Sequence, residues 1–411
     1  MKRSAELTAV TGMGLSVVVV LYLAHALPLY FFTVALPAIL RSQAVDLRWI
    51  GMLSLLYIPW AFKFLWAPLI DRYYVRAWGR RKTWLWGTQL ALVLGVLALA
   101  VTAFDYGLWV FILVSLWIST FAATQDIAID GYTVESLPTA DYRLGSMAQS
   151  MGVALGSMVG GAGVLWLYQT SGWQVALLVL AALTALPMLA VARINDRTPV
   201  TGAEKSPRPS FINTFKRKEM LWAFLLIVVY RLIEAPAMAM LTPLMIDQKW
   251  SLTEIGLLMS VVGASVGLLA AVAAARALKT RKAESLLIQI GWGRTVLYLL
   301  LGVLLYGGVA QGSSLWLGAI VLLMLAIRYI AMTSLYALLM RLCSRQQAGT
   351  DFTVLVCLEL LVYFLGGAVS GLLAERLGYA AYYLLLGGLS VLSVLLSQRV
   401  MKKITAGFAN S

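Results

Sequence analysis

The stretch Arg193–Glu219 reads RINDRTPVTGAEKSPRPSFINTFKRKE and interrupts a chain that is otherwise dominated by apolar runs. It contains three prolines and seven basic residues, a composition typical of a loop rather than of a buried helix. The stretch lies near the middle of the 411 residues. We therefore expect an N-terminal bundle in residues 1–192, a linker in 193–219 and a C-terminal bundle in 220–411.

Six apolar runs lie on each side of this linker. A bilayer core about 30 Å thick needs a helix of about 20 apolar residues. The composition, 61% apolar and 12% charged, with a mean hydropathy of +0.85, excludes a soluble enzyme. The pattern predicts an all-α membrane protein with twelve transmembrane helices in two six-helix bundles, a layout found in secondary transporters. The expected spans are residues 12–40, 49–70, 84–103, 108–130, 144–168, 173–192, 220–246, 254–276, 285–309, 315–340, 352–374 and 380–398.

Basic residues are concentrated on one predicted side of the membrane. The net charge of +14 comes from 32 Lys and Arg against 18 Asp and Glu. If the N-terminus is cytoplasmic, 24 of the 32 lie in cytoplasmic segments and four on the other side. Cytoplasmic loops carry such an excess, so we expect both termini in the cytoplasm and no nucleic-acid partner. The first apolar run follows a basic start without a cleavage site, which predicts a retained helix rather than a signal peptide.

Three arginines fall near the predicted midplane of the membrane: Arg231, Arg294 and Arg328. A charge at that depth costs at least about 2.5–3.5 kcal/mol, so each is a candidate functional residue. Glu234 lies three residues after Arg231 and could balance one charge, which leaves about two positive charges over. An anionic substrate would balance them. The alternative is neutralisation by helix-end carbonyls, Glu234 and Glu359.

Aromatic residues accompany these arginines in the predicted spans. Guanidinium groups bind carboxylates bidentately and stack on aromatic rings. We therefore expect a substrate between the two bundles, contacted by some of the three arginines and by rings of helices 1, 2, 7 and 10. The predicted aromatic contacts are Tyr30, Tyr57, Trp60, Tyr230 and Tyr329.

Three further ionisable residues are candidates for coupling transport to protons: His25, Glu234 and Glu359. His25 is the only histidine of the chain, and Pro28 distorts the helix three residues later. Histidine titrates near physiological pH, so coupling through His25 is one interpretation. The other is that His25 only satisfies a hydrogen bond within the first helix.

Asp126 and Asp130, in the sequence TQDIAID, are spaced i,i+4 and share one face of the fourth predicted helix. One interpretation is a cytoplasmic gate, in which they pair with Lys63 or with the basic residues of the adjoining loop, Arg72, Arg80 and Arg81. The other is a Mg²⁺ site for a diphosphate in an integral-membrane transferase. The gate is favoured because the chain has no second Asp-rich motif. The sequence also lacks a GxxxxGK[ST] loop and a cluster of metal ligands, so we expect no cofactor, no use of ATP and no resident metal.

Two stretches carry a family resemblance. Phe62–Trp84, FKFLWAPLIDRYYVRAWGRRKTW, and residues 123–138, ATQDIAIDGYTVESLP, resemble the AmpG-like branch of the major facilitator superfamily. The first contains that superfamily's D-R…G-R-R element, here Asp71, Arg72, Gly79, Arg80 and Arg81. It departs from the usual pattern by six residues between Arg72 and Gly79 and by Ala67-Pro68 where glycine is common. The second half of the chain has only a degenerate counterpart, Arg276–Lys282.

This resemblance implies a permease that works by alternating access, with Asp71 and its neighbours at the cytoplasmic gate. Muropeptide permeases of the branch usually have longer chains with extra helices. The compact length, VALPAILRSQ (residues 34–43) and VGGAGVL (residues 159–165) resemble instead the RhtX/FptX-type siderophore permeases of the Gram-negative inner membrane. We therefore expect proton-coupled import of an anionic ferric siderophore from the periplasm, with muropeptide transport as the alternative and a membrane transferase as the less favoured one.

Overall fold

The computed structural model describes residues 2–43, 53–102, 108–194, 208–307 and 314–409, which form helices and turns and no strand. The chain divides into two compact units. Unit 1 is Met1–Asn213 with Cys343–Val354, and unit 2 is Thr214–Leu342 with Leu355–Ser411. Most of the predicted linker, with Arg197 and Lys205, lies outside the described residues, as does Arg48, so the predicted linker boundaries stay a prediction.

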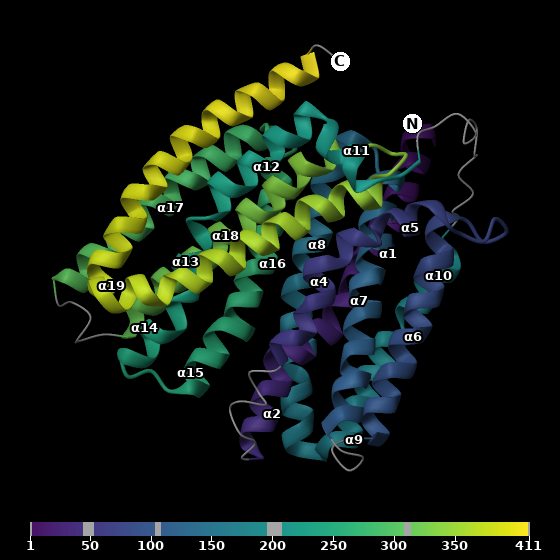
Figure 1. The fold of residues 1–411 in the computed structure, drawn as a ribbon, viewed down its shortest axis with the longest axis horizontal. Coiled ribbons are helices and arrows are strands. Elements are labelled where there is room, and N and C mark those ends of the chain that lie inside the picture. Colours follow the sequence, from purple (N-terminus) through teal and green to yellow (C-terminus); the bar gives the residue numbers. More distant parts are fainter. Residues whose placement is uncertain (1, 44–52, 103–107, 195–207, 308–313, 410–411) are drawn as a thin grey trace. The chain divides into compact units, whose positions relative to one another are not determined.

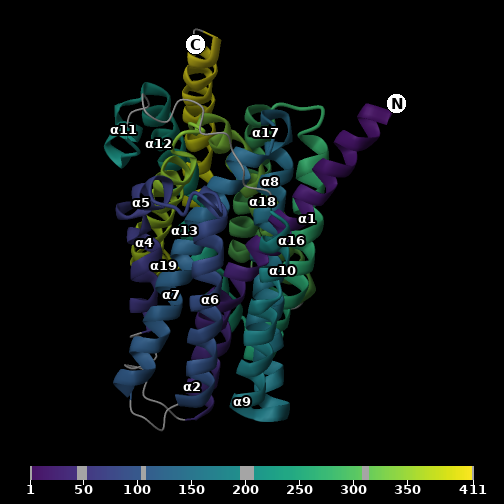
Figure 2. The same cartoon turned by 90° about the vertical axis from the view of Figure 1, so that its right-hand side faces the viewer.

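The described part of unit 1 contains long helices and several short helical segments. Its helices α6 and α7 run side by side, and α9 packs against α6 (Figure 2). The elements are α1 (Lys2–Tyr30), η1 (Phe31–Ala35), α2 (Leu36–Ser42), η2 (Leu53–Tyr57), α4 (Ile58–Phe62), η3 (Lys63–Leu65), α5 (Ala67–Arg72), α6 (Arg80–Thr102), α7 (Leu108–Ser136), η4 (Thr139–Asp141), α8 (Tyr142–Gly156), η5 (Ser157–Gly163), α9 (Val164–Ala185) and α10 (Pro187–Arg193).

Unit 2 consists of helices that pack around α18, with α16 and α17 against it. The short helix α11 (Phe211–Lys216) contains the boundary between the units. The remaining elements are α12 (Lys218–Arg231), α13 (Glu234–Ala239), α14 (Leu241–Asp247), α15 (Leu252–Gly256), η6 (Leu257–Val262), α16 (Gly263–Ala277), α17 (Ala283–Tyr306), α18 (Ser314–Leu342) and α19 (Ala348–Ala409), the first residues of which belong to unit 1.

Nine helical stretches of the described residues are long and apolar enough to cross a membrane. Two of them, Thr139–Ala192 and Ala348–Ala406, have 54 and 59 residues. At 1.5 Å per residue each exceeds about 80 Å, more than twice a bilayer core, so each provides two crossings. A glycine with positive φ divides each stretch: Gly172 (φ 81°) and Gly378 (φ 72°), where α19 bends sharply (Figure 1).

The predicted second span, residues 49–70, is not one helix. Its described part is broken into η2, α4, η3 and α5. Pro59 and Pro68 each lie at the first turn of a new α-helix, where the missing N–H group is tolerated, whereas either would break a continuous helix. With this broken segment, the described residues provide a stretch for each of the twelve expected crossings, and the all-α architecture expected from the sequence is confirmed.

Small residues allow α1 and α8 to pack closely. A Cβ atom on Gly152 would lie 2.6 Å from Cβ of Tyr22 and 2.9 Å from its backbone carbon. One turn and two turns further, Gly156 and Gly160 meet Ala26 and Leu27 in the same way. Two π-helical segments, η1 and η5, contact each other beyond this interface, where Gly161 lies against Val34.

We expect Gly152→Ala to destabilise the protein by about 1–3 kcal/mol, because the added methyl group overlaps the Tyr22 backbone and cannot be relieved by a side-chain rotation. Gly87→Ala in α6 is the matched control. Its added Cβ meets open space, so the change should be neutral or stabilising by up to about 1 kcal/mol. Thermal unfolding in detergent measures both, and equal melting temperatures for the two variants would contradict the packing described here.

Candidate functional site

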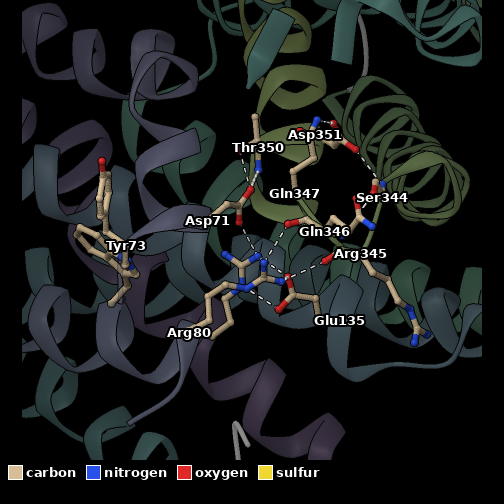
Figure 3. A network of polar contacts seen from close by, with 12 residues as sticks. Asp71, Tyr73, Arg80, Glu135, Ser344, Arg345, Gln346, Gln347, Thr350 and Asp351 are labelled. Carbon is tan, nitrogen blue, oxygen red and sulfur yellow. Dashed lines mark hydrogen bonds and ion pairs between the residues drawn. The ribbon is translucent and has the colours of Figure 1, made fainter. Parts of the chain in front are cut away.

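Arg81 is completely buried in unit 1 and is held by two carboxylates. Its terminal nitrogen lies 2.6 Å from Oδ1 of Asp71, and its Nε donates a 3.0 Å hydrogen bond to Glu135. Arg80 also pairs with Glu135. Two basic and two acidic groups therefore balance in what we call the gate network, formed by Asp71, Arg80, Arg81 and Glu135 (Figure 3).

Two glycines make room for this network. A Cβ atom on Gly131 of α7 would lie 2.3 Å from the central carbon of the Arg81 guanidinium. On Gly349, at the start of α19, it would lie 2.9 Å from Oδ1 of Asp71. Neither the guanidinium nor the carboxylate can withdraw without losing its partner, so both positions require glycine.

The gate network is bonded to the segment between α18 and α19. Thr350 donates to Oδ2 of Asp71 from its backbone N–H (2.7 Å) and from its hydroxyl (2.6 Å). Asp71 thus satisfies one of the first N–H groups of α19, where a helix has no internal acceptor and favours negative charge. Arg80 donates to the carbonyls of Gln346 (2.9 Å) and Arg345 (3.1 Å) (Figure 3). These bonds explain why residues 343–354 belong to unit 1.

The sequence placed some members of this network but not all. Asp71, Arg80 and Arg81 were expected at a gate, whereas Glu135 and Thr350 were not identified. Asp126 and Asp130 were expected to pair with Lys63 or with these arginines, and they contact groups on α1 and η3, with Lys63 among them. Arg72 is exposed and lies over the ring of Tyr73, 5.0 Å from its centroid, outside the network.

A second group of buried polar residues in unit 1 surrounds Asp126. Lys63 pairs with Oδ2 of Asp126, and Nε2 of His25 lies 3.3 Å from its Oδ1. The ring of Trp60 is 5.5 Å from that of His25 and 5.4 Å from the Lys63 ammonium. The pairing of Lys63 with Asp126 is one of those that the sequence allowed, and its part in gating stays a prediction.

The predicted arginines of unit 2 differ in their partners. Arg231 is buried and pairs with Glu234 (2.6 Å) and Glu359 (2.5 Å). Nε of Arg328 lies 3.7 Å from Glu234, and its guanidinium is 5.5 Å from the Tyr363 ring centroid. The side chain of Arg328 is 38% exposed, compared with 5% for Arg231. Of these two, Arg328 is therefore the one accessible to a solute.

Arg294 is fixed by protein atoms. Its three nitrogens donate to the hydroxyl of Ser390 (3.1 Å), the carbonyl of Tyr230 (2.8 Å) and the hydroxyl of Ser393 (3.1 Å). Its guanidinium also stacks on the Tyr230 ring, 4.6 Å from the centroid. The expected excess of about two positive charges is thus too large. With Glu359 included, three arginines face two glutamates, which leaves an excess of one positive charge. Arg294 is held by neutral acceptors.

The aromatic residues expected to contact a substrate are divided between the units. In unit 2, Tyr230 is buried and donates to the carbonyl of Leu287 (3.2 Å), while Tyr329 packs on Gly267. A narrow pocket of unit 2 is lined by Tyr230, Tyr298, Glu234, Arg294 and Arg328, among others. In unit 1, Tyr30 lies against Gly156, Tyr57 is half-buried at the end of η2, and Trp60 is buried.

We expect Asp71→Asn to destabilise the protein by about 3 kcal/mol, because Arg81 would keep its charge in a buried site with one carboxylate fewer. Asp141→Asn provides the control, since Asp141 forms a partly exposed pair with Arg143 at 3.5 Å that is worth less than about 1 kcal/mol. Thermal unfolding in detergent compares them. An unchanged melting temperature for Asp71→Asn would mean that the gate network contributes nothing to stability.

The comparisons with known proteins agree with this architecture. The family model described as Major Facilitator Superfamily matches residues 18–358. The chain is 29% identical over 389 residues to the anhydromuropeptide permease of Escherichia coli K12. This match covers 90% of this chain and 76% of the permease. It is 22% identical over 269 residues to the putative transporter AmpG 4 of Rickettsia conorii, a match that covers 60% of this chain and 65% of that transporter. The solved structure of the proton:xylose symporter XylE superposes with a TM-score of 0.70 at 12% identity, covering 95% and 96%.

Proposed function

Because this chain belongs to the Major Facilitator Superfamily, we propose that it carries an anionic muropeptide across the bacterial cytoplasmic membrane by alternating access. The chain is a multi-pass membrane transporter and not an enzyme. The transferase interpretation of Asp126 and Asp130 is therefore excluded. The direction proposed is import into the cytoplasm, with both chain termini on the cytoplasmic side, as the distribution of basic residues predicts.

The similarity to the anhydromuropeptide permease favours muropeptide over siderophore. That match covers 90% of the chain and therefore extends through both halves. The expectation of a siderophore depended on chain length and on two short strings, residues 34–43 and 159–165. The greater length of the permease, of which 24% lies outside the match, is compatible with a shorter transporter for the same class of solute. The alternative from the sequence thus becomes the main proposal.

Arg328 is the proposed contact for the negative charge of the substrate. It is the accessible guanidinium of the unit 2 group, and Glu234 lies too far from its Nε for a hydrogen bond, at 3.7 Å. Its planar donors fit a carboxylate, and the adjacent Tyr363 ring offers a surface for stacking. Arg231 is already neutralised by two glutamates, and we assign Arg294 to helix packing.

The gate network supplies a mechanism for alternating access. Residues 343–354 are bonded to unit 1, yet the chain on both sides of them, α18 and the rest of α19, belongs to unit 2. A movement of unit 2 must therefore either carry this segment away from Asp71 and Arg80 or bend the chain at its ends. We propose that breaking these bonds opens the cytoplasmic side. Coupling to protons, through His25, Glu234 or Glu359, is part of the same proposal.

The substrate is tested by uptake into a strain that lacks its own muropeptide permease and expresses this chain. We expect accumulation of radiolabelled anhydromuropeptide well above the vector control, and its loss after addition of a protonophore. A panel of ferric siderophores is measured in the same cells. Uptake of a siderophore without uptake of the peptide would reject the muropeptide proposal in favour of the expectation from the short strings.

We expect Arg328→Ala to raise the KM for anhydromuropeptide about tenfold or more, the loss of about 1.4 kcal/mol or more of binding to a charged group. Arg341→Ala is the matched control: its side chain is also 38% exposed and lies 3.7 Å from a carboxylate, that of Glu284. Initial uptake rates at matched expression provide both values. An equal KM for the two variants would remove Arg328 from the proposed binding site.

A further inference from the structure

Unit 1 contains a group of buried ionisable residues that the gate network does not include. It consists of Tyr22 and His25 of α1, Lys63 of η3, and Asp126 and Asp130 of α7, which we call the α1–α7 cluster. All five side chains are buried within the unit, with residue exposures between 0% and 6%. Helical spacing places Asp126 near Asp130 on α7 and Tyr22 near His25 on α1. The contacts between α1, η3 and α7 depend on the tertiary fold.

The contacts in the α1–α7 cluster leave several polar atoms unsatisfied. Lys63 pairs with Asp126, and the Tyr22 hydroxyl donates to Oδ1 of Asp130 at 2.8 Å. Gln149 of α8 adds a long bond to the same oxygen, 3.4 Å. Within the part of the chain that the structure describes, no hydrogen bond reaches Nδ1 of His25, Oδ1 of Asp126 or Oδ2 of Asp130. These are atoms that can accept a proton.

The charges of the α1–α7 cluster do not balance when His25 is neutral. Among the described residues, two aspartates of the cluster face one lysine, which leaves one negative charge in the cluster. The nearby Arg81 does not compensate for it, because Arg80 and Arg81 are already matched by Asp71 and Glu135. A buried charge without a partner is costly, and such groups commonly change protonation instead. One additional proton makes the cluster neutral.

The carboxylates of unit 2 differ from those of the α1–α7 cluster in their charge balance. Glu234 and Glu359 both contact Arg231, and Arg328 lies near Glu234. With Arg294, which is held by neutral acceptors, three guanidinium groups of unit 2 face these two carboxylates, so the carboxylates need no added proton for charge balance. Of the three residues expected to couple transport to protons, His25 is therefore the one in a group that is short of a positive charge.

We propose that the α1–α7 cluster binds the coupling proton, shared by His25 and Asp126. This rests on the proposed function as a proton-coupled importer. In the binding step, a hydronium ion transfers its proton to the lone pair of the neutral imidazole and leaves as water. The imidazolium and the Lys63 ammonium then both face Asp126, which holds α1, η3 and α7 together. Release of the proton leaves Lys63, among the described residues, as the cation paired with Asp126.

Coupling is tested in proteoliposomes with radiolabelled anhydromuropeptide. For Asp126→Asn we expect no accumulation above equilibrium under an inward pH gradient, while exchange of labelled for unlabelled peptide continues. Asp141→Asn, which removes a partly exposed carboxylate of the same unit, is the control and should accumulate peptide like the wild type. Full accumulation by Asp126→Asn would overturn the assignment of the proton site and leave the proposed transport function intact.

A second measurement needs no substrate. His25 is the only histidine, so protein labelled with ¹⁵N-histidine and purified without a polyhistidine tag gives the signal of one imidazole. In the wild type we expect this signal to change to that of the imidazolium as the pH is lowered. Asp126→Asn should reduce the ratio of protonated to neutral imidazole about tenfold at a given pH, because the anion that stabilises the imidazolium is gone.

The two measurements distinguish failure of the proton site from failure of the proposed function. If wild-type His25 stays neutral at every pH at which the protein remains folded, His25 does not bind the proton, whatever the substrate is. If the imidazole titrates as expected but the wild type moves no anhydromuropeptide, the proton site stands and the proposed substrate is wrong. His25→Gln supplies a second variant for the accumulation assay should Asp126→Asn fold poorly.

Discussion

The burial of the Arg81 guanidinium constrains the part of unit 1 where α5, α7 and the start of α19 meet. A guanidinium removed from water must be met by carboxylates, and here they come from two different elements, α5 and α7. Asp71 serves twice, because its other oxygen accepts both donors of Thr350 at the start of α19. The position of a segment almost 280 residues away along the chain therefore depends on one buried ion pair.

Helix α7 connects the gate network with the α1–α7 cluster. Asp126 and Asp130 belong to the cluster, Glu135 belongs to the network, and Gly131 is the surface on which Arg81 rests. A change of charge at Asp126 is thus separated from the Arg81 ion pairs by little more than two helical turns. In the proposed transport cycle, α7 is therefore the element that the proton site shares with the network holding the start of α19.

Much of the architecture could be predicted from hydropathy, since a bilayer imposes the length and the composition of each crossing. The break in the second crossing was missed although Pro59 and Pro68 are visible in the sequence, because the count of apolar residues alone suggests a continuous helix. Local pairs such as Arg231 with Glu234 follow from helical spacing. Glu135 and Thr350 could not be identified in this way, since their partners lie far away in the sequence. Arg294 was expected to contact a substrate, and its actual partners could not be predicted. They are two serine hydroxyls and a backbone carbonyl from helices that are distant in the sequence.

The paired π-helical turns η1 and η5 have a mechanical consequence. A π turn widens a helix and disturbs its regular bonding, so it is a place where a helix bends with little loss of packing. The segment η1 interrupts α1–α2, and η5 interrupts α8–α9. Because η1 and η5 contact each other, the two helix pairs are interrupted side by side. Gly160 and Gly161 of η5 allow Leu27 and Val34 to approach closely there. The two π-helical turns therefore place an interruption of α1–α2 and one of α8–α9 side by side, directly beyond the close interface of α1 with α8.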